Sequence, residues 1–240
     1  MSITVYWTVN PYTNIGAYRA EDPLNISSKF FSTYLPKIKN INSDYSKCPF
    51  VREHLKKIYG IKQIYDATFN FDFDKEIYKC ENWCSDLFDK LIVRSFSDNL
   101  FSWGLGYIFF TEQKSLIMKT YPPYLEDNEI NKKTIMIPGA YDIGNWFRPL
   151  DFSFHLKKDF KNDSLTFNSE DVITYVEFET NDSISFEYFH MNPELDDIKN
   201  NLMATKWGVK KSHSNSWFYD IFKTRKIKKE IIQNIKNNLS

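Results

Sequence analysis

Hydrophobic and polar residues alternate with a period of two through much of the middle of the chain, which is typical of strands with one buried face. Residues 64–74 place three phenylalanines on one face and polar residues between them. Residues 148–157 repeat the pattern, with Leu150, Phe152, Phe154 and Leu156 on one face and Asp151, Ser153 and His155 on the other. Both segments are therefore predicted to be half-buried strands.

Further strands are predicted wherever β-branched and aromatic residues lie between Asn, Asp, Ser or Gly turns. They span residues 3–9, 91–94, 132–138, 165–168, 172–180 and 183–191. Residues 100–121 are predicted to form a hairpin with its turn at 112–114. Most of these strands follow one another without an intervening helix, which favours antiparallel pairing.

Helical spacing of hydrophobic residues occurs near both ends of the chain. Residues 46–60 predict a helix with Ser46 as its cap, Pro49 in its first turn and Gly60 just past its end. A short helix passing into the strand at 91–94 is predicted from about residue 80. Two more helices are expected near the C-terminus, one of them capped by Asn192 with Pro193 at its first position and the other a basic amphipathic helix within 214–239.

These elements predict an α+β fold with an antiparallel β-sandwich or jelly-roll-like core. Residues 1–62 would form an N-terminal strand and helix that pack on the core, or a separate lobe. The core itself would span residues 63–191, and a helical basic extension would follow at residues 192–240.

The net charge of zero is unevenly distributed along the chain. From Lys199 onward there are ten Lys or Arg against two acidic residues, a net charge of +8, whereas the preceding residues carry −8. The basic positions of the last predicted helix include Lys223, Arg225, Lys226, Lys228 and Lys229. This tail is predicted either to dock on its own acidic body or on another copy, or to bind nucleic acid.

Residue usage and the absence of targeting patterns in the sequence predict the cellular location of the protein. Asn, Ile, Lys, Phe and Tyr abound while Ala is rare, a usage typical of AT-rich genomes. The three widely spread cysteines argue against a disulfide framework, and the first residues do not resemble a secretion signal. No segment has eighteen consecutive hydrophobic residues. We therefore expect a soluble protein inside the host cell, or one carried in a virion, without a membrane partner.

Motifs of the common enzyme chemistries are missing from the sequence. There is no G-x-S-x-G nucleophile elbow and no phosphate-binding glycine loop, so no cofactor is predicted. A zinc site built from Cys48, His54, Cys80 and Cys84 has the wrong spacing, and no metal site is predicted. His155 and His190, on two predicted strands, are the remaining candidates for a cupin-like metal centre or a small-molecule site.

Residues 137–156 concentrate the other candidate ligand or partner residues. Gly139 and Gly144 allow tight turns or close approach of another chain segment. Trp146 anchors the segment, and Arg148 needs an anionic partner if it is buried, for which Asp142 or Asp151 is available. The segment is either the structural corner of a sandwich or the rim of a pocket.

Several stretches resemble uncharacterised proteins encoded by tailed phages of marine bacteria. They are MIPGAYDIGNWFRPLDFSFHLKKD, VITYVEFETNDSISFEYF, CPFVREHLKKIYGI and YIFFTEQKSLIMKTYPPYL, and together they span about residues 46–190. The resemblance implies a phage or phage-like origin. It implies no activity and no catalytic residue.

Three functions follow from these observations as hypotheses. The first is a phage-type accessory or virion-associated protein that acts by protein–protein interaction, without evident catalysis. The alternative is a cupin-like barrel enzyme or small-molecule-binding protein with a metal site at the β core. The third is nucleic-acid binding through the basic C-terminal helix.

Overall fold

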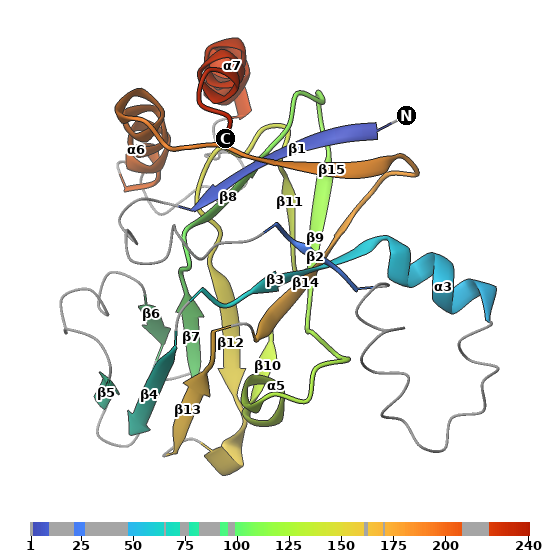
Figure 1. The fold of residues 1–240 in the computed structure, drawn as a ribbon. Helices are drawn as coiled ribbons and strands as arrows, with labels where there is room; N and C mark the ends of the chain where they lie inside the picture. The colour runs from blue at the N-terminus through green and yellow to red at the C-terminus, as the bar shows by residue number, and fades with distance from the viewer. Residues whose placement is uncertain are drawn as a thin grey trace.

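The computed structural model describes the chain at residues 2–9, 22–26, 48–64, 66–72, 77–81, 92–95, 99–160, 163–169, 171–207 and 221–240 (Figure 1). Its helices are α3 (Pro49–Lys56), α5 (Glu129–Lys133), the 3-10 helix η5 (Lys158–Phe160), α6 (Pro193–Trp207) and α7 (Ile221–Lys236). The first eight strands are β1 (Ser2–Val9), β2 (Leu24–Asn25), β3 (Ile58–Lys62), β4 (Ala67–Asp72), β5 (Ile77–Cys80), β6 (Ile92–Ser95), β7 (Leu100–Trp103) and β8 (Tyr107–Phe110). The remaining strands are β9 (Ile117–Tyr121), β10 (Thr134–Met136), β11 (Gly139–Asp142), β12 (Phe152–Leu156), β13 (Ser164–Phe167), β14 (Val172–Phe178) and β15 (Ser183–Tyr188).

These strands form sheets that pack together, so the fold is α+β and mostly sheet, as predicted. Within the described residues the strand orders are β15-β1-β8 (sheet A), β11-β9-β14-β3-β2 (sheet B), β13-β4-β5 (sheet C) and β10-β12-β7-β6 (sheet D). One pairing among the described strands departs from the predicted antiparallel arrangement, because β1 runs parallel to β15. Their pairing is possible because most of the chain lies between the two strands, so no tight turn dictates their direction. A jelly-roll connectivity stays a prediction.

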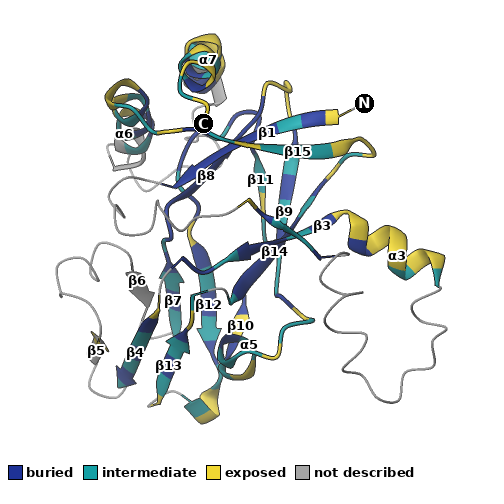
Figure 2. Ribbon diagram, in the orientation of Figure 1, coloured by how far each residue is buried: buried dark blue, intermediate teal, exposed yellow. Residues whose placement is uncertain are grey.

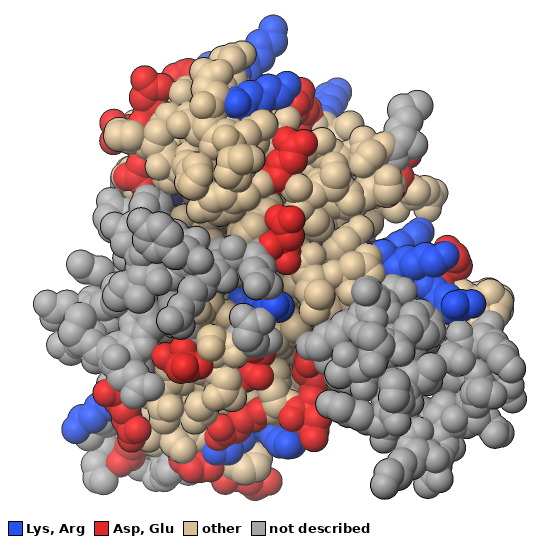
Figure 3. Space-filling view, in the orientation of Figure 1, with Lys and Arg blue, Asp and Glu red and all other residues tan. Residues whose placement is uncertain are grey.

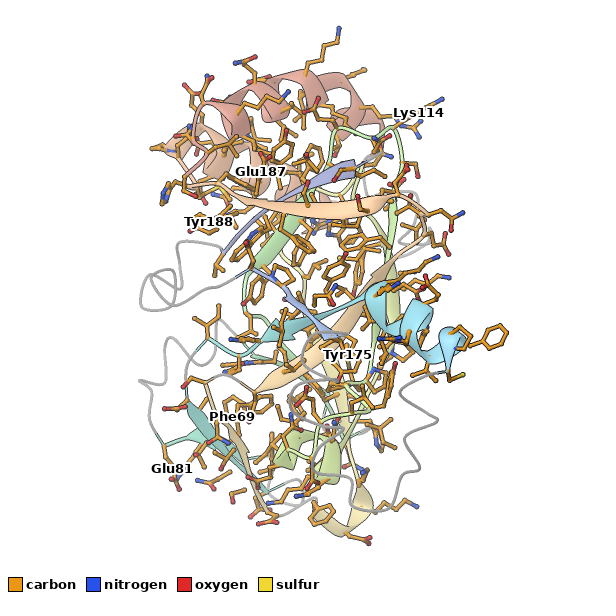
Figure 4. All side chains as sticks on the ribbon, turned by 45° about the vertical axis from the view of Figure 1, so that its right-hand side comes forward. Phe69, Glu81, Lys114, Tyr175, Glu187 and Tyr188 are labelled. Carbon is orange, nitrogen blue, oxygen red and sulfur yellow. The ribbon has the colours of Figure 1, made fainter. Side chains whose placement is uncertain are left out.

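An aromatic core fills the space between sheets C and D. The rings of Phe69 and Trp103 meet edge to face at 4.8 Å, and Phe101 stacks on Phe154 at 5.3 Å. Phe69 comes from β4 and the other three from β7 and β12, and Figure 4 labels Phe69 in the lower half of the molecule. The alternation along β4 and β12 is confirmed, because their hydrophobic positions are buried and their polar ones are not (Figure 2).

The segment predicted as a hairpin instead connects two sheets. β8 pairs with β1 in sheet A, whereas β9 pairs with β11 and β14 in sheet B. Two alternating strands joined by a short polar turn have the same pattern whether or not they pair with each other. The predicted turn at residues 112–114 is present, but the hairpin is wrong.

The N-terminal helix is shorter than predicted. α3 begins after Cys48 with Pro49 in its first turn, and Ser46 lies outside the described residues. Gly60, predicted to end the helix, is inside β3, where an added Cβ would lie 2.9 Å from Val172. Gly60 therefore allows the side chain of Val172 to pack close to the backbone of β3, and it does not end the helix. The helix predicted after residue 80 falls largely outside the described residues, while Cys80 itself ends β5.

Helices α6 and α7 cover the outer face of sheet A, at the top of Figure 1. Ile231 and Ile235 of α7 and Leu195 of α6 are fully buried against Phe110 and Phe147. Asn192 caps α6 as predicted, since its side chain accepts a hydrogen bond of 2.8 Å from the backbone N–H of Leu195. No described helix combines the length and apolar character needed to cross a bilayer.

The last residues of the chain join the same sheet. Leu239 forms an isolated bridge with Phe189, and the backbone N–H of His190 donates to the carbonyl of Asn238 at 2.8 Å. The N–H of Ser240 donates to the carbonyl of Tyr188. Because β15 also pairs with β1, both ends of the chain are fixed in sheet A.

Candidate functional site

The segment singled out in the sequence, residues 137–156, contains a turn closed by one carboxylate. Asp142 ends β11, and its two oxygens accept hydrogen bonds from four donors. The donors are the hydroxyl of Ser115 at 2.9 Å, the backbone N–H groups of Leu116 and Gly144 at 3.1 Å each, and the side-chain amide of Asn145 at 2.8 Å. The carboxylate therefore holds the turn at residues 142–145 against the start of β9.

This turn is also where helix α7 docks. The Lys228 ammonium donates to the carbonyls of Gln113 and Gly144, at 2.5 and 2.6 Å, and lies 5.4 Å from the centre of the Phe110 ring. Burial lowers the pKa of Lys228 from its ordinary value, although Asp142 and Glu112 oppose the shift. Arg225 adds a hydrogen bond from its Nε to the side-chain oxygen of Asn145.

A second contact ties the end of α7 to the first strand. Glu112 accepts hydrogen bonds of 2.7 Å from the Tyr6 hydroxyl and from Lys236. The bonds from Lys236 and then Tyr6 lower the pKa of the Glu112 carboxyl. Burial, reinforced by the Glu112 carboxylate, raises the pKa of the Tyr6 hydroxyl. Both groups are therefore held in their ordinary protonation states at neutral pH.

The basic residues of the tail thus divide into two sets. Lys228 and Arg225 contact the body of the protein, whereas Lys226 and Lys229 are exposed. The side chain of Lys223 lies outside the described part of the chain. The amphipathic tail uses its hydrophobic side and part of its charge to dock on its own body.

The buried Arg148 lies over the partly buried ring of Trp146 beside this turn. The Arg148 guanidinium lies 5.3 Å from the centre of the Trp146 ring, which meets Tyr141 edge to face at 5.5 Å. Arg148 is almost completely buried. Asp142 and Asp151 are the partners predicted for Arg148. The four donors to the Asp142 oxygens are other groups, and pairing with Asp151 stays a prediction. The structural corner and the pocket rim both stay predictions for this segment.

One candidate histidine lies in a sheet, and the other lies just past the end of a strand of a different sheet, outside the strand predicted for it. His155 is on β12 of sheet D, opposite Ile135 of β10. His190 follows β15 of sheet A, where its ring meets that of Tyr188 at 5.2 Å. Across the described ranges, no group of three His, Cys, Asp or Glu is arranged to hold a metal ion. The metal-enzyme hypothesis therefore gains no geometric support.

The outer face of sheet D is the feature that the sequence analysis missed. We call the sheet D face the set of outward residues on its three strands with described side chains: Ile135 and Ile137 near β10, Ser153 and His155 on β12, and Leu100 and Ser102 on β7. Ile135 is 54% exposed and Ile137 is 42% exposed. The signal available in the sequence is TIMIPGAY, residues 134–141, eight positions without a charge.

A matched pair of substitutions tests the role of the Asp142 turn. Asp142→Asn replaces one of the two accepting carboxylate oxygens with an NH2 group, which cannot accept a hydrogen bond. At least one of the four donors therefore loses its acceptor. We expect the free energy of unfolding to fall by about 1–3 kcal/mol in urea titrations. Asp127→Asn is the control, since its side chain is 91% exposed beside Lys132. Equal stability of the two variants would contradict a structural role for Asp142.

Comparison with protein-family models gives no match, and comparison with curated proteins finds no similar sequence. The function is therefore inferred from the residues of this chain.

Proposed function

We propose that the protein is a phage-type accessory or virion-associated protein that acts by protein–protein interaction, without catalysis, and that its contact surface is the sheet D face. The single observation that carries the proposal is the exposure of Ile135 and Ile137 on a sheet face without Lys, Arg, Asp or Glu on its three strands with described side chains. Depletion of charge with retention of hydrophobic groups is typical of the centre of protein interfaces.

The structural roles of the candidate chemical groups favour a binding protein over an enzyme. Asp142 closes a turn, the buried Arg148 lies over the Trp146 ring, and His155 is on β12 of sheet D whereas His190 follows β15 of sheet A. General acid–base or metal chemistry needs two or three such groups facing one substrate. Their separate structural surroundings favour a binding protein.

The position of the basic tail supports contact through sheet D rather than nucleic-acid binding through α7. Lys228 donates to backbone carbonyls of the body, and Lys236 is paired with Glu112. Figure 3 shows Lys and Arg at the top, over α7, with Asp and Glu close to them, and side chains of both charges over the lower half of that face. Phosphate binding depends on several cations acting together. Here part of that charge is already engaged within the chain.

Site-specific photo-crosslinking tests the proposal directly. A benzophenone amino acid is placed at position 137, and at position 50 as the control, because Phe50 is 84% exposed and belongs to α3. After irradiation in the producing cell, position 137 is expected to give a defined protein adduct that position 50 does not give. Mass spectrometry identifies the captured chain. Equal or absent labelling at both positions would reject the sheet D face as a contact surface.

A further inference from the structure

A groove of about 480 Å³ lies between helices α6 and α7. Its hydrophobic floor is formed by Ile198 and Leu202 of α6 and Ile227 of α7. Leu202 comes from the second half of α6 and Ile227 from the first half of α7, whereas the N–H of His190, just before α6, donates to the carbonyl of Asn238, just after α7. The two helices therefore run antiparallel, side by side at the top of Figure 1.

Charges of opposite sign lie on the two sides of this groove. Glu194 and Asp197 are on α6, towards the end of the helix pair where α6 begins, and Lys226 and Lys229 are on α7, further towards the other end. All four side chains are exposed, and none of them is paired with another charge in the described part of the chain. We call the groove and these four side chains the α6–α7 face. It has an acidic corner, a hydrophobic centre and a basic corner.

A nucleic acid is poorly matched to the α6–α7 face. Its phosphates would meet the exposed carboxylates of Glu194, Asp197 and Glu230, which outnumber the exposed ammonium groups of Lys226 and Lys229. Phosphate binding depends on cations that act together without such neighbours. The face is instead complementary to a surface that carries both charges, in the opposite order, around a hydrophobic centre.

A second copy of the chain carries that complementary surface. A twofold axis that passes through the groove, perpendicular to the line joining the two charged corners, exchanges the acidic corner with the basic one. We propose that the α6–α7 face binds the same face of a second copy, so that Glu194 and Asp197 of each copy lie against Lys226 and Lys229 of the other. Complementary charge favours this arrangement and disfavours one in which like corners meet. The proposal goes beyond the proposed function, because these helices cover sheet A and are not part of the sheet D face.

The helix pair is large enough for a reversible dimer. α6 has 15 residues and α7 has 16, so each helix is about 23 Å long at about 1.5 Å per residue. The outward halves of two cylinders of this length, each about 10 Å in diameter, offer at most about 700 Å² for each copy. Standard interfaces bury about 600–1,000 Å² for each partner. The face reaches the lower part of this range, so we expect a dimer that dissociates on dilution.

Analytical ultracentrifugation of the full chain, from about 10 μM to about 1 mM, tests the proposal. The unmodified protein is expected to pass from monomer to dimer as its concentration rises. Two double variants each reverse one charged corner: Glu194→Lys with Asp197→Lys, and Lys226→Glu with Lys229→Glu. Each variant alone sets like charges against one another at both ends of the contact, and is expected to dimerise at least about tenfold more weakly. An equimolar mixture of the two restores opposite charges at both ends, and is expected to dimerise again.

The control has the same change of charge outside the α6–α7 face. Glu53→Lys with Asp127→Lys alters two side chains that are 66% and 91% exposed, and is expected to dimerise like the unmodified protein. Thermal unfolding verifies that every variant is folded. An unmodified protein that stays monomeric at about 1 mM would overturn the proposal. So would charge reversals that weaken the dimer no more than the control does, or a mixture of the two reversed variants that stays monomeric. Crosslinking from position 137 tests a different surface, so the proposed function stands or fails separately.

Discussion

Removal of residues 221–240 is expected to abolish cooperative folding of the remaining chain. The truncated protein loses α7 and the terminal bridge to Phe189. Tyr6, Ile108 and Phe110 of sheet A, and Phe147 packed against them, then lose the cover of α7, although all are buried in the full chain. We expect the truncated chain to aggregate or to unfold without a sharp transition.

The free energy of unfolding that the truncated chain loses can be estimated from the burial of α7. Ile231 and Ile235 are each fully buried, and burial of an isoleucine side chain contributes about 1.5–3 kcal/mol. The two hydrogen bonds donated by the partly buried Lys228 ammonium each contribute about 1.5–3 kcal/mol, the range for hydrogen bonds that involve a charged group. Domains are typically stable by only about 5–15 kcal/mol. The helix therefore contributes a share comparable to the whole stability.

A point substitution isolates the hydrophobic part of this effect. Ile231→Asp buries a carboxylate against sheet A and is expected to destabilise the fold by more than about 3 kcal/mol. Gln233→Asp, on the exposed side of the same helix, is the control. Urea titration followed by circular dichroism compares the two. If both variants unfold at the same urea concentration, α7 is peripheral to the fold and the truncation prediction is wrong as well.

Gly144→Ala is expected to destabilise the protein by about 2–4 kcal/mol, because its methyl group would collide with a neighbouring backbone. The added Cβ would lie 2.6 Å from the carbonyl oxygen of Gln113 and 3.0 Å from the Cα of Ser115. Side-chain rotation relieves neither contact. The displaced carbonyl of Gln113 is also an acceptor for Lys228, so the substitution loosens the docking of α7 too.

Gly139→Ala provides the comparison within the same segment. Its added Cβ would lie 2.9 Å from the hydroxyl oxygen of Tyr141 and 3.0 Å from the ring, and both belong to a side chain that can move. We expect a loss of less than about 1 kcal/mol, near the ordinary cost of a tolerated substitution. For a chain of this size, the melting temperature should fall by about 10 °C for Gly144→Ala and by only a few degrees for Gly139→Ala. Similar shifts in both variants would contradict the steric account.

Local structure was largely predictable because its causes are local. Burial of every second residue follows directly from the geometry of a strand, so the pattern of Phe69 and Phe71 and that of residues 152–156 placed two strands correctly. The cap at Asn192 was predictable for the same reason, since its acceptor and the N–H of Leu195 lie within one turn.

The pairing of strands was not predictable from such patterns. Ser2 lies opposite Ser183, and nothing in the residues near either strand specifies the other. The same limit explains the wrong hairpin, since β8 and β9 alternate like a hairpin but pair with strands far away in the sequence. Pairing depends on which faces must be buried together in the whole molecule.

The candidate site contains both a local feature that the sequence predicted and a long-range contact that it did not predict. Glycines and a carboxylate indicated a turn at residues 139–144, but residues 139–142 form β11, and the turn follows it at residues 142–145. The attachment of Lys228 and Arg225 to that turn joins residues about eighty positions apart. Their charge made them candidate binding residues of the basic tail, but only the packing of α7 on sheet A shows what they contact.

The arrangement of sheet A has a consequence for the order in which the chain folds. β1 is made before its neighbours β8 and β15 and its covering helix α7, which follow much later in the chain. At ribosomal rates of about 5–20 residues per second, β1 waits roughly 10–50 s before the last helix emerges. During that time the hydrophobic ITVYWTV segment lacks its final partners. Folding of this half of the molecule is therefore expected to finish only after α7 has emerged, and slowly, because its contacts are so distant in sequence.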